Sequence, residues 1–313
     1  MTRYLLRRLG QALLVLLLVS LLVFSLLHLL PGGLVRAQLG PKASPHEVAQ
    51  LAIQEGLNKP IFVQYAIWLG NALHGNLGYS YKLNSPVATL LGEYFPRDLL
   101  LVGIALFLAI AISIPLGLLQ GVRRNRDVDY GLSFVLLALY SMPSFLLGVI
   151  GIILFNIEFN VFPPTAIHFG TSFGADVSAL VLPVGTLMLG NVAYYSRYMR
   201  SAVIDNLLED YVRTAKAKGS SWRRILTRHV LRNSLLPTVS LVGISFPYVI
   251  SGSLIVEALF DYPGMGLLFW NASQDRDYPV LLGVILLISS AVVVGNLVAD
   301  ILYMVLDPRI RYG

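Results

Sequence analysis

The chain has 313 residues, of which 56% are hydrophobic and only 13% are charged, and its mean hydropathy is +0.71. A soluble domain carries about 25% charged residues because its surface faces water, so this composition excludes a soluble globular protein and indicates that lipid covers much of the surface. The net charge of +6 is compatible with nucleic-acid binding, but the positions of the charges fit a membrane topology better, and no nucleic-acid partner is expected.

Six apolar segments are long enough, or nearly long enough, to cross a bilayer, which requires roughly 20 apolar residues in a helix. They cover residues 10–30, 99–120, 131–155, 179–196, 238–258 and 280–306. A cleaved signal peptide is the alternative for the first segment, since Arg3, Arg7 and Arg8 precede it. Because the apolar run is longer than that of a typical signal peptide and no small-residue cleavage site closes it, we predict an uncleaved anchor.

Lysine and arginine are concentrated on one side of these segments. With a cytoplasmic N-terminus, the inside segments are 1–9, 121–130, 197–236 and 307–313, and they hold 17 of the 23 Lys and Arg residues. Positive residues favour the cytoplasmic side of a membrane. The sequence therefore predicts a multi-pass protein with both termini in the cytoplasm.

The first outside segment, residues 31–98, is long for a loop, and its pattern predicts structure. Ser44 can cap a helix that begins with Pro45, and Glu47 supplies negative charge to the first turn. A second set of apolar residues falls on one helical face and predicts an interfacial helix before the second span. This set is Val87, Leu90, Leu91, Tyr94 and Phe95.

The most informative stretch is the cytoplasmic segment between the fourth and fifth spans. Apolar residues between 203 and 215 have the spacing of an amphipathic helix, and Glu209 and Arg213 can pair on its polar face. Gly219 suits the left-handed position after the last turn of that helix, and Ser220 or Ser221 can cap a second helix. The pattern predicts a helix–turn–helix that projects from the membrane.

Two interpretations of this hairpin remain open from its periodicity. A basic amphipathic hairpin can lie on anionic headgroups, which its nine Lys and Arg residues would favour. The hairpin can also insert into a groove on a partner protein, with the apolar stripe as its anchor.

Several motifs resemble one family of membrane proteins. Ala215 and Gly219, followed by Leu236-Pro237, look like the EAA loop of ABC importer permeases, although Arg213 and Thr214 stand at the first two positions of that motif. The stretches DYVRTAKAKG, SMPSFLLG, VEALFDYPGMGLL and RDYPVLLG, with the N-terminal MTRYLLRRLG and the C-terminal DPRIRYG, are similar to the dipeptide, oligopeptide and nickel branch of these permeases. The resemblance covers nearly the whole chain, with the motifs in the expected order.

The resemblance implies an all-α, polytopic membrane protein with about six transmembrane helices and the type I ABC importer permease fold. Residues 1–98 would form an N-terminal transmembrane helix and a structured extracytoplasmic segment. Residues 99–313 would form a core permease domain of five transmembrane helices with a cytoplasmic coupling loop over 197–237. The implied location is the cytoplasmic (inner) membrane of a bacterium or archaeon.

The resemblance also implies a function, namely translocation of di- or oligopeptides, or of a related solute such as a nickel complex, by alternating access. The implied partners are a second homologous permease, two cytoplasmic ATPase subunits, an extracytoplasmic solute-binding protein and the lipid bilayer. Because the sequence contains no GxxxxGK[ST] phosphate loop, ATP and magnesium are expected on the ATPase subunits. We expect this chain to bind no cofactor and to be non-catalytic.

In this family the EAA loop forms the coupling helix, which sits in a cleft of the ATPase subunit. The residues carried over by position are Asp210, Tyr211, Arg213, Thr214, Ala215, Lys218 and Gly219. A second set consists of candidates for lining the translocation pathway, with core packing as the alternative for each. These candidates are Met142, Pro143, Phe145, Ser245, Pro247, Ser251 and Glu257.

Two other classes of protein are weighed against the importer permease. A self-contained secondary transporter or channel predicts intramembrane charge relays or inverted repeats, and neither is clear in the sequence. An intramembrane enzyme needs a Ser/His or paired-Asp constellation, and His28 is the single histidine inside a predicted span. The five histidines show no ligand spacing and cysteine is absent, so no metal site is predicted.

Overall fold

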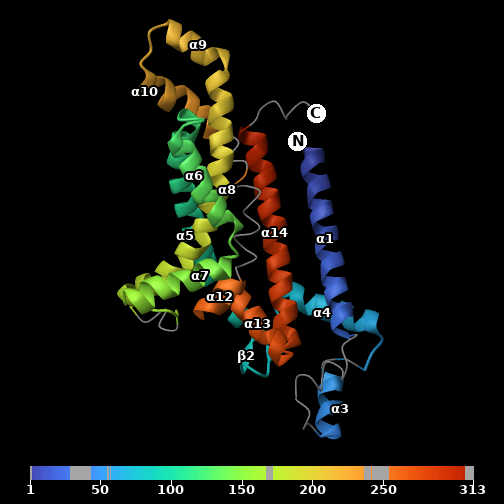
Figure 1. Ribbon diagram of the computed structural model, residues 1–313. Coiled ribbons are helices and arrows are strands. Elements are labelled where there is room, and N and C mark those ends of the chain that lie inside the picture. Colours follow the sequence, from blue (N-terminus) through green and yellow to red (C-terminus); the bar gives the residue numbers. More distant parts are fainter. Residues whose placement is uncertain are drawn as a thin grey trace.

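The computed structural model describes residues 2–28, 44–54, 56, 58–166, 172–235, 241 and 254–306, and helices dominate this part of the chain (Figure 1). The helices are α1 (Thr2–His28), α3 (Pro45–Gln54), α4 (Ile61–Leu73), α5 (Val87–Val122), α6 (Asp127–Ser141), α7 (Ser144–Ile152), η1 (Ile153–Glu158), α8 (Phe173–Leu208), α9 (Asp210–Ala217), α10 (Trp222–Arg224), η2 (Ile225–Val230), α12 (Leu254–Phe260), α13 (Met265–Asp275) and α14 (Tyr278–Leu306). Two short strands, β1 (Tyr79–Ser80) and β2 (Ser85–Pro86), pair antiparallel. The predicted all-α class is confirmed.

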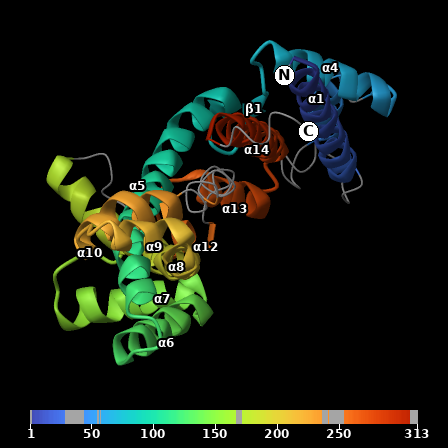
Figure 2. The ribbon, with the colours of Figure 1, turned by 90° about the horizontal axis from the view of Figure 1, so that it is seen from above.

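Four of the described helices are long and apolar enough to cross a membrane: Arg7–Leu26 in α1, all of α5 and α8, and Tyr278–Leu297 in α14. A bent pair of helices raises this number to five. Helix α1 packs along α14, whereas α5 begins beside α14 and then runs along α8 (Figure 2). The predicted fifth span, 238–258, lies mostly outside the described residues.

The predicted third span, 131–155, is not straight. Helix α6 and the α7–η1 pair meet at an angle of 101°, with Met142 extended and Pro143 before the first residue of α7. Proline lacks the N–H that would continue the hydrogen-bond ladder and disfavours a helical conformation in the residue before it. The predicted span is therefore broken at Met142 and Pro143.

Helices α5 and α8 pack against each other along a stripe of small side chains. The buried residues of α5 recur every four positions, at Leu101, Ala105, Ala109, Ser113, Gly117 and Gly121. A Cβ added at Gly117 would lie 2.6 Å from Met199 Cβ, and one added at Gly121 would lie 2.5 Å from Val203 Cγ1. Small residues let helix backbones approach closely inside a membrane. The close approach joins α5 and α8 into one unit.

An ion pair attaches α6 to this unit. Arg200 of α8 donates from Nε to Oδ1 and from Nη2 to Oδ2 of Asp129, both at 2.7 Å. Asp129 also accepts from the backbone N–H of Asn125 at 3.0 Å. Because Asp129 is only 1% exposed, its charge depends on this bidentate partner.

The predicted cap of α3 is confirmed. The backbone N–H of Glu47 donates to Ser44 Oγ at 3.2 Å, and the N–H of Ser44 donates to Glu47 Oε2 at 2.8 Å. This reciprocal pair is a capping box. The backbone hydrogen bond from Ser44, and secondarily its side-chain bond, hold the pKa of Glu47 below its usual value because they favour the charged carboxylate.

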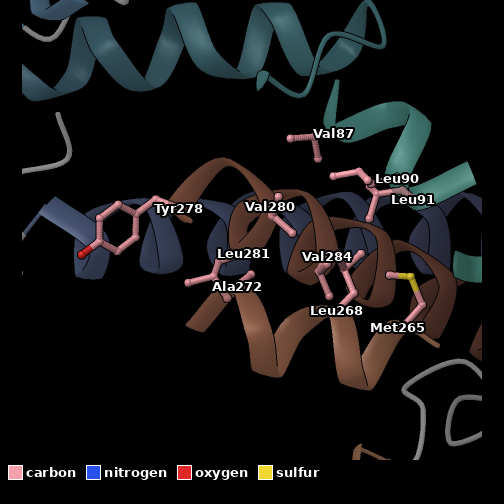
Figure 3. Close-up of a cluster of buried hydrophobic side chains, with 10 residues drawn as sticks. All are labelled: Val87, Leu90, Leu91, Met265, Leu268, Ala272, Tyr278, Val280, Leu281 and Val284. Atoms are coloured by element: carbon pink, nitrogen blue, oxygen red, sulfur yellow. The ribbon is translucent and has the colours of Figure 1, made fainter. Parts of the chain in front are cut away.

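The start of α5 lies in a hydrophobic core and does not form a separate interfacial helix. Val87 is fully buried, and Leu90 and Leu91 are nearly so; Figure 3 shows them facing side chains of α13 and α14. The predicted interfacial helix is wrong because its apolar face is covered by protein and α5 continues through Pro96 into the span. The predicted domain boundary at residue 98 falls inside this helix and stays a prediction.

The hairpin of β1 and β2 is attached to the start of α14 by a buried hydrogen bond, which the sequence did not predict. Ser80 Oγ donates to Asp277 Oδ2, and these residues are 0% and 4% exposed. Burial raises the pKa of Asp277, although the hydrogen bonds from Ser80 and from the backbone of Val280 oppose the shift.

This raised pKa predicts a pH effect that Asp277→Asn should remove. The folded protein binds the Asp277 proton more tightly than the unfolded chain does, so its contribution to stability is present below about pH 4 and is lost as the pH rises through the folded pKa. Asparagine keeps an oxygen acceptor for Ser80 and carries no charge. The free energy of unfolding of the purified protein, measured across pH, should therefore fall less with rising pH in Asp277→Asn. Asp277→Ala should lower the free energy of unfolding by about 1–3 kcal/mol at all pH values, because Ser80 loses its acceptor. If the free energy of unfolding fell equally steeply with pH in the wild type, Asp277→Asn and Asp277→Ala, the prediction would be contradicted.

Candidate functional site

The predicted hairpin extends directly from a membrane helix. Helix α8 ends at Leu208, Glu209 is extended with ψ 148°, and α9 begins at the next residue. The hairpin comprises α9, the turn that follows it, α10 and η2, and it projects beyond the neighbouring ends of α5 and α6 (Figure 1). The prediction of one unbroken helix through residue 215 is wrong at Glu209, where the extended backbone breaks it.

The apolar stripe of the hairpin faces the chain's own helices. Val212 and Ala215 of α9 are 1% and 8% exposed, and they pack in one cluster with Met199, Val203 and Ile225. This cluster fixes the hairpin to the end of α8. Of the two interpretations that the periodicity leaves open, neither uses Val212 and Ala215 as an exposed stripe, because the chain's own side chains cover them.

The turn after α9 requires glycine. Gly219 has φ +74°, its N–H donates to the carbonyl of Lys216 at 3.0 Å, and the N–H of Ser220 donates to the carbonyl of Ala215 at 3.1 Å. This is a Schellman motif, in which a left-handed residue closes the helix. A Cβ added at Gly219 would meet nothing within 4 Å, so the tip of the hairpin is open to a partner. Ser221 precedes α10 but makes no side-chain cap.

The outer face of the hairpin is polar and basic. Arg213 pairs with Asp210 at 3.4 Å and not with the predicted Glu209. Lys216 Nζ lies 5.0 Å from the centre of the Trp222 ring, across the turn, where a cation–π contact links α9 to α10. Further exposed cations are Lys218, Arg223, Arg224, Arg228 and Arg232.

The seven predicted coupling residues lie together in α9 and its closing turn, but they divide into two sets. Asp210, Arg213, Thr214, Lys218 and Gly219 are exposed. Ala215 is buried, and Tyr211 is half-buried with its hydroxyl donating to Asn206 Oδ1 at 2.7 Å. The first set is available to a partner, while the second holds the hairpin on α8.

The predicted pathway residues lie in different places. Met142, Pro143 and Phe145 lie at the bend between α6 and α7, with Met142 37% and Phe145 48% exposed. Ser245, Pro247 and Ser251 lie outside the described residues. Glu257 is fully buried, and its carboxylate accepts from the N–H of Leu267, in the first turn of α13, at 3.0 Å.

Sequence reasoning missed the neighbours of Glu257. Asp98 of α5 is fully buried close to Glu257. Tyr262 is also buried and donates to the carbonyl of Arg97 at 2.7 Å. Atoms of Glu257 occupy the space that a side chain at Gly264 or Gly266 would need. Two glycines in the stretch PGMGLL, Gly264 and Gly266, were the sequence signal that another side chain, here the Glu257 carboxylate, packs against this turn.

Four described helices long enough to cross a membrane, one of which leads into a basic hairpin, define a multi-pass membrane protein. Residues 113–312 match the family described as the binding-protein-dependent transport system inner membrane component. Residues 1–102 match the N-terminal part of binding-protein-dependent transport system membrane components. The chain belongs to this family, and the predicted membership of the ABC importer permeases is confirmed.

Curated relatives match over the full length. The chain is 38% identical over 316 residues to the oligopeptide transport system permease protein AppB of Bacillus subtilis, with 100% of each chain covered. It is 36% identical over 313 residues to a probable peptide ABC transporter permease protein of Sinorhizobium fredii, with 99% of each chain covered.

Proposed function

We propose that this chain is a permease subunit of an ATP-driven importer that carries peptides across the cytoplasmic membrane. Support comes from family membership and from the two relatives, whose names specify peptide or oligopeptide transport. The expected partners are a second homologous permease, two ATPase subunits and a solute-binding protein, with ATP and magnesium bound on the ATPases.

The observation that carries the proposal is the direct continuation of α8 into the hairpin. Because α9 packs on the end of α8, and α8 packs closely on α5, a force applied to the hairpin moves two membrane helices together. We assign the exposed set, Asp210, Arg213, Thr214, Lys218 and Gly219, to contact with the ATPase. Ala215 and Tyr211 transmit the motion from within the hairpin.

The proposed orientation places the hairpin and both ends of the chain in the cytoplasm. The start of α1 and the far end of α14 lie at the same end of the molecule as α9 (Figure 1), which supports this orientation. In the proposal, the bend at Met142 and Pro143 borders the translocation pathway. Glu257 has a structural role in this proposal: its carboxylate joins α12 to α13, and it does not need to contact the solute.

Uptake by a reconstituted complex tests the proposed function. Proteoliposomes containing the permease pair, the ATPases and the binding protein should accumulate labelled di-, tri- or longer peptides when ATP is present on the ATPase side. A non-hydrolysable ATP analogue should give no accumulation. Uphill uptake by this chain alone would support the self-contained transporter instead, and absence of uptake for every peptide length would exclude a peptide substrate.

A further inference from the structure

A cavity of about 600 Å³ lies at the end of the membrane helices opposite the hairpin. Side chains of α1, α4, the segment before β1, and the start of α14 form its walls. Phe24 is in the last turn of the spanning part of α1, while Tyr278 and Leu282 are among the first five residues of the spanning part of α14. The cavity therefore lies at the ends of two membrane-spanning segments.

The cavity is lined by both apolar and polar side chains. The apolar ones include Phe24, Ile67 and Leu282. The polar ones include three amides, Gln64, Asn71 and Asn76, and the exposed cation Lys59. Among the described residues, no carboxylate pairs with Lys59. A ligand that matches both kinds of side chain has an acyl chain and an anionic, hydrogen-bonding headgroup.

Helix α4 itself is built to lie in the membrane surface. It contains no charged residue, and it lies across the end of α1 (Figure 1). Tyr65 and Trp68 fix it there: both rings lie within 6 Å of Phe24, with centroids at 5.4 and 5.8 Å. Phe62 and Leu73 remain 78% and 79% exposed. Exposed apolar residues with tyrosine and tryptophan at the boundary are typical of a helix that contacts lipid.

We propose that this cavity binds a phospholipid, with its phosphate at Lys59 and the neighbouring amides and an acyl chain between α1 and α14. The ligand is a structural lipid that joins α4 and α1 to α14. The position of the cavity between the ends of two spanning helices favours a membrane component, and the charge of Lys59 favours an anionic headgroup.

Native mass spectrometry of the purified complex, titrated with phosphatidylglycerol in phosphatidylethanolamine nanodiscs, tests the proposal. Lys59→Gln should weaken phosphatidylglycerol binding by about fivefold, the effect of one lost cation near a membrane surface. Asn71→Trp should remove the bound lipid by filling the cavity. Lys82→Gln, an exposed cation outside the cavity walls, should leave binding unchanged.

Three outcomes would overturn the proposal. The wild-type complex could hold no phosphatidylglycerol above the level of Lys59→Gln, or Asn71→Trp could retain the lipid fully. If Lys59→Gln and Asn71→Trp instead lost affinity for the solute-binding protein while keeping their lipid, the cavity would be a protein-docking surface. Peptide uptake measured on the same samples separates this result from failure of the proposed function.

Discussion

Replacing Gly219 by valine should abolish ATP-driven peptide uptake while the permease still folds. The residue needs a left-handed backbone, φ +74°, which costs a β-branched side chain about 1–2 kcal/mol, less than the total stability of a typical domain. The added side chain enters open space at the tip of the hairpin, where the proposal places the ATPase. A clash at the centre of an interface costs about 2 kcal/mol or more, so ATPase association should weaken by about 30-fold or more.

Gly75→Val is the matched control for this prediction. Gly75 also has a positive φ, +82°, and open space around it, but it follows α4 at the opposite end of the molecule (Figure 1). Both variants should lose similar stability in a thermal melt, and only Gly219→Val should lose the ATPase in pull-down and uptake assays. Asparagine tolerates the left-handed backbone, so Gly219→Asn shows whether ATPase association is lost through backbone strain or through steric exclusion of the ATPase by the new side chain. Normal ATPase association in Gly219→Val would contradict the assignment.

Adding a methyl group at Gly117 or Gly121 should separate α5 from α8 and destabilise the permease. The added Cβ at Gly117 would lie 2.8 Å from the backbone oxygen of Ser196, so the helix itself must shift. Overpacking of this kind costs about 1–3 kcal/mol for each substitution. Gly117→Ala and Gly121→Ala should both lower the melting temperature of the purified complex. Peptide uptake measured well below that melting temperature should also fall, because the hairpin acts through α8.

Gly103→Ala provides the control within the same helix. A Cβ added at Gly103 meets nothing within 4 Å, and alanine favours helix more than glycine does. Its melting temperature should equal or exceed that of the unmodified protein. Equal melting temperatures for all three alanine variants would show that α5 and α8 do not depend on close backbone approach.

The membrane helices and the hairpin could be predicted from sequence because their signals are local. Apolar length marks a span, and the spacing of Val212 and Ala215 marks one face of a helix. Capping chemistry is equally local, which explains the correct placement of Ser44 and Gly219.

Tertiary contacts account for what the sequence did not predict. Periodicity gives an apolar face but not its partner, so the spacing of Val87 and Leu90 predicts a membrane-surface helix although α13 and α14 cover them. For the same reason the periodicity of α9 leaves its partner open, although Met199 and Ile225 cover the stripe. The contacts of Asp277 with Ser80 and of Glu257 with Leu267 join residues that are distant in sequence or fold back over a turn. No short-range pattern reports such pairs.

Single-cysteine cross-linking tests the central claim, that the exposed tip of the hairpin contacts the ATPase. The chain contains no cysteine, so Lys218→Cys introduces a unique thiol at the tip, and Lys82→Cys introduces one at the other end of the molecule. With a short bifunctional reagent, Lys218→Cys should form a covalent adduct with the ATPase subunit, and Lys82→Cys should not. An ATPase adduct at residue 82, or none at residue 218 in a transport-competent complex, would contradict the account.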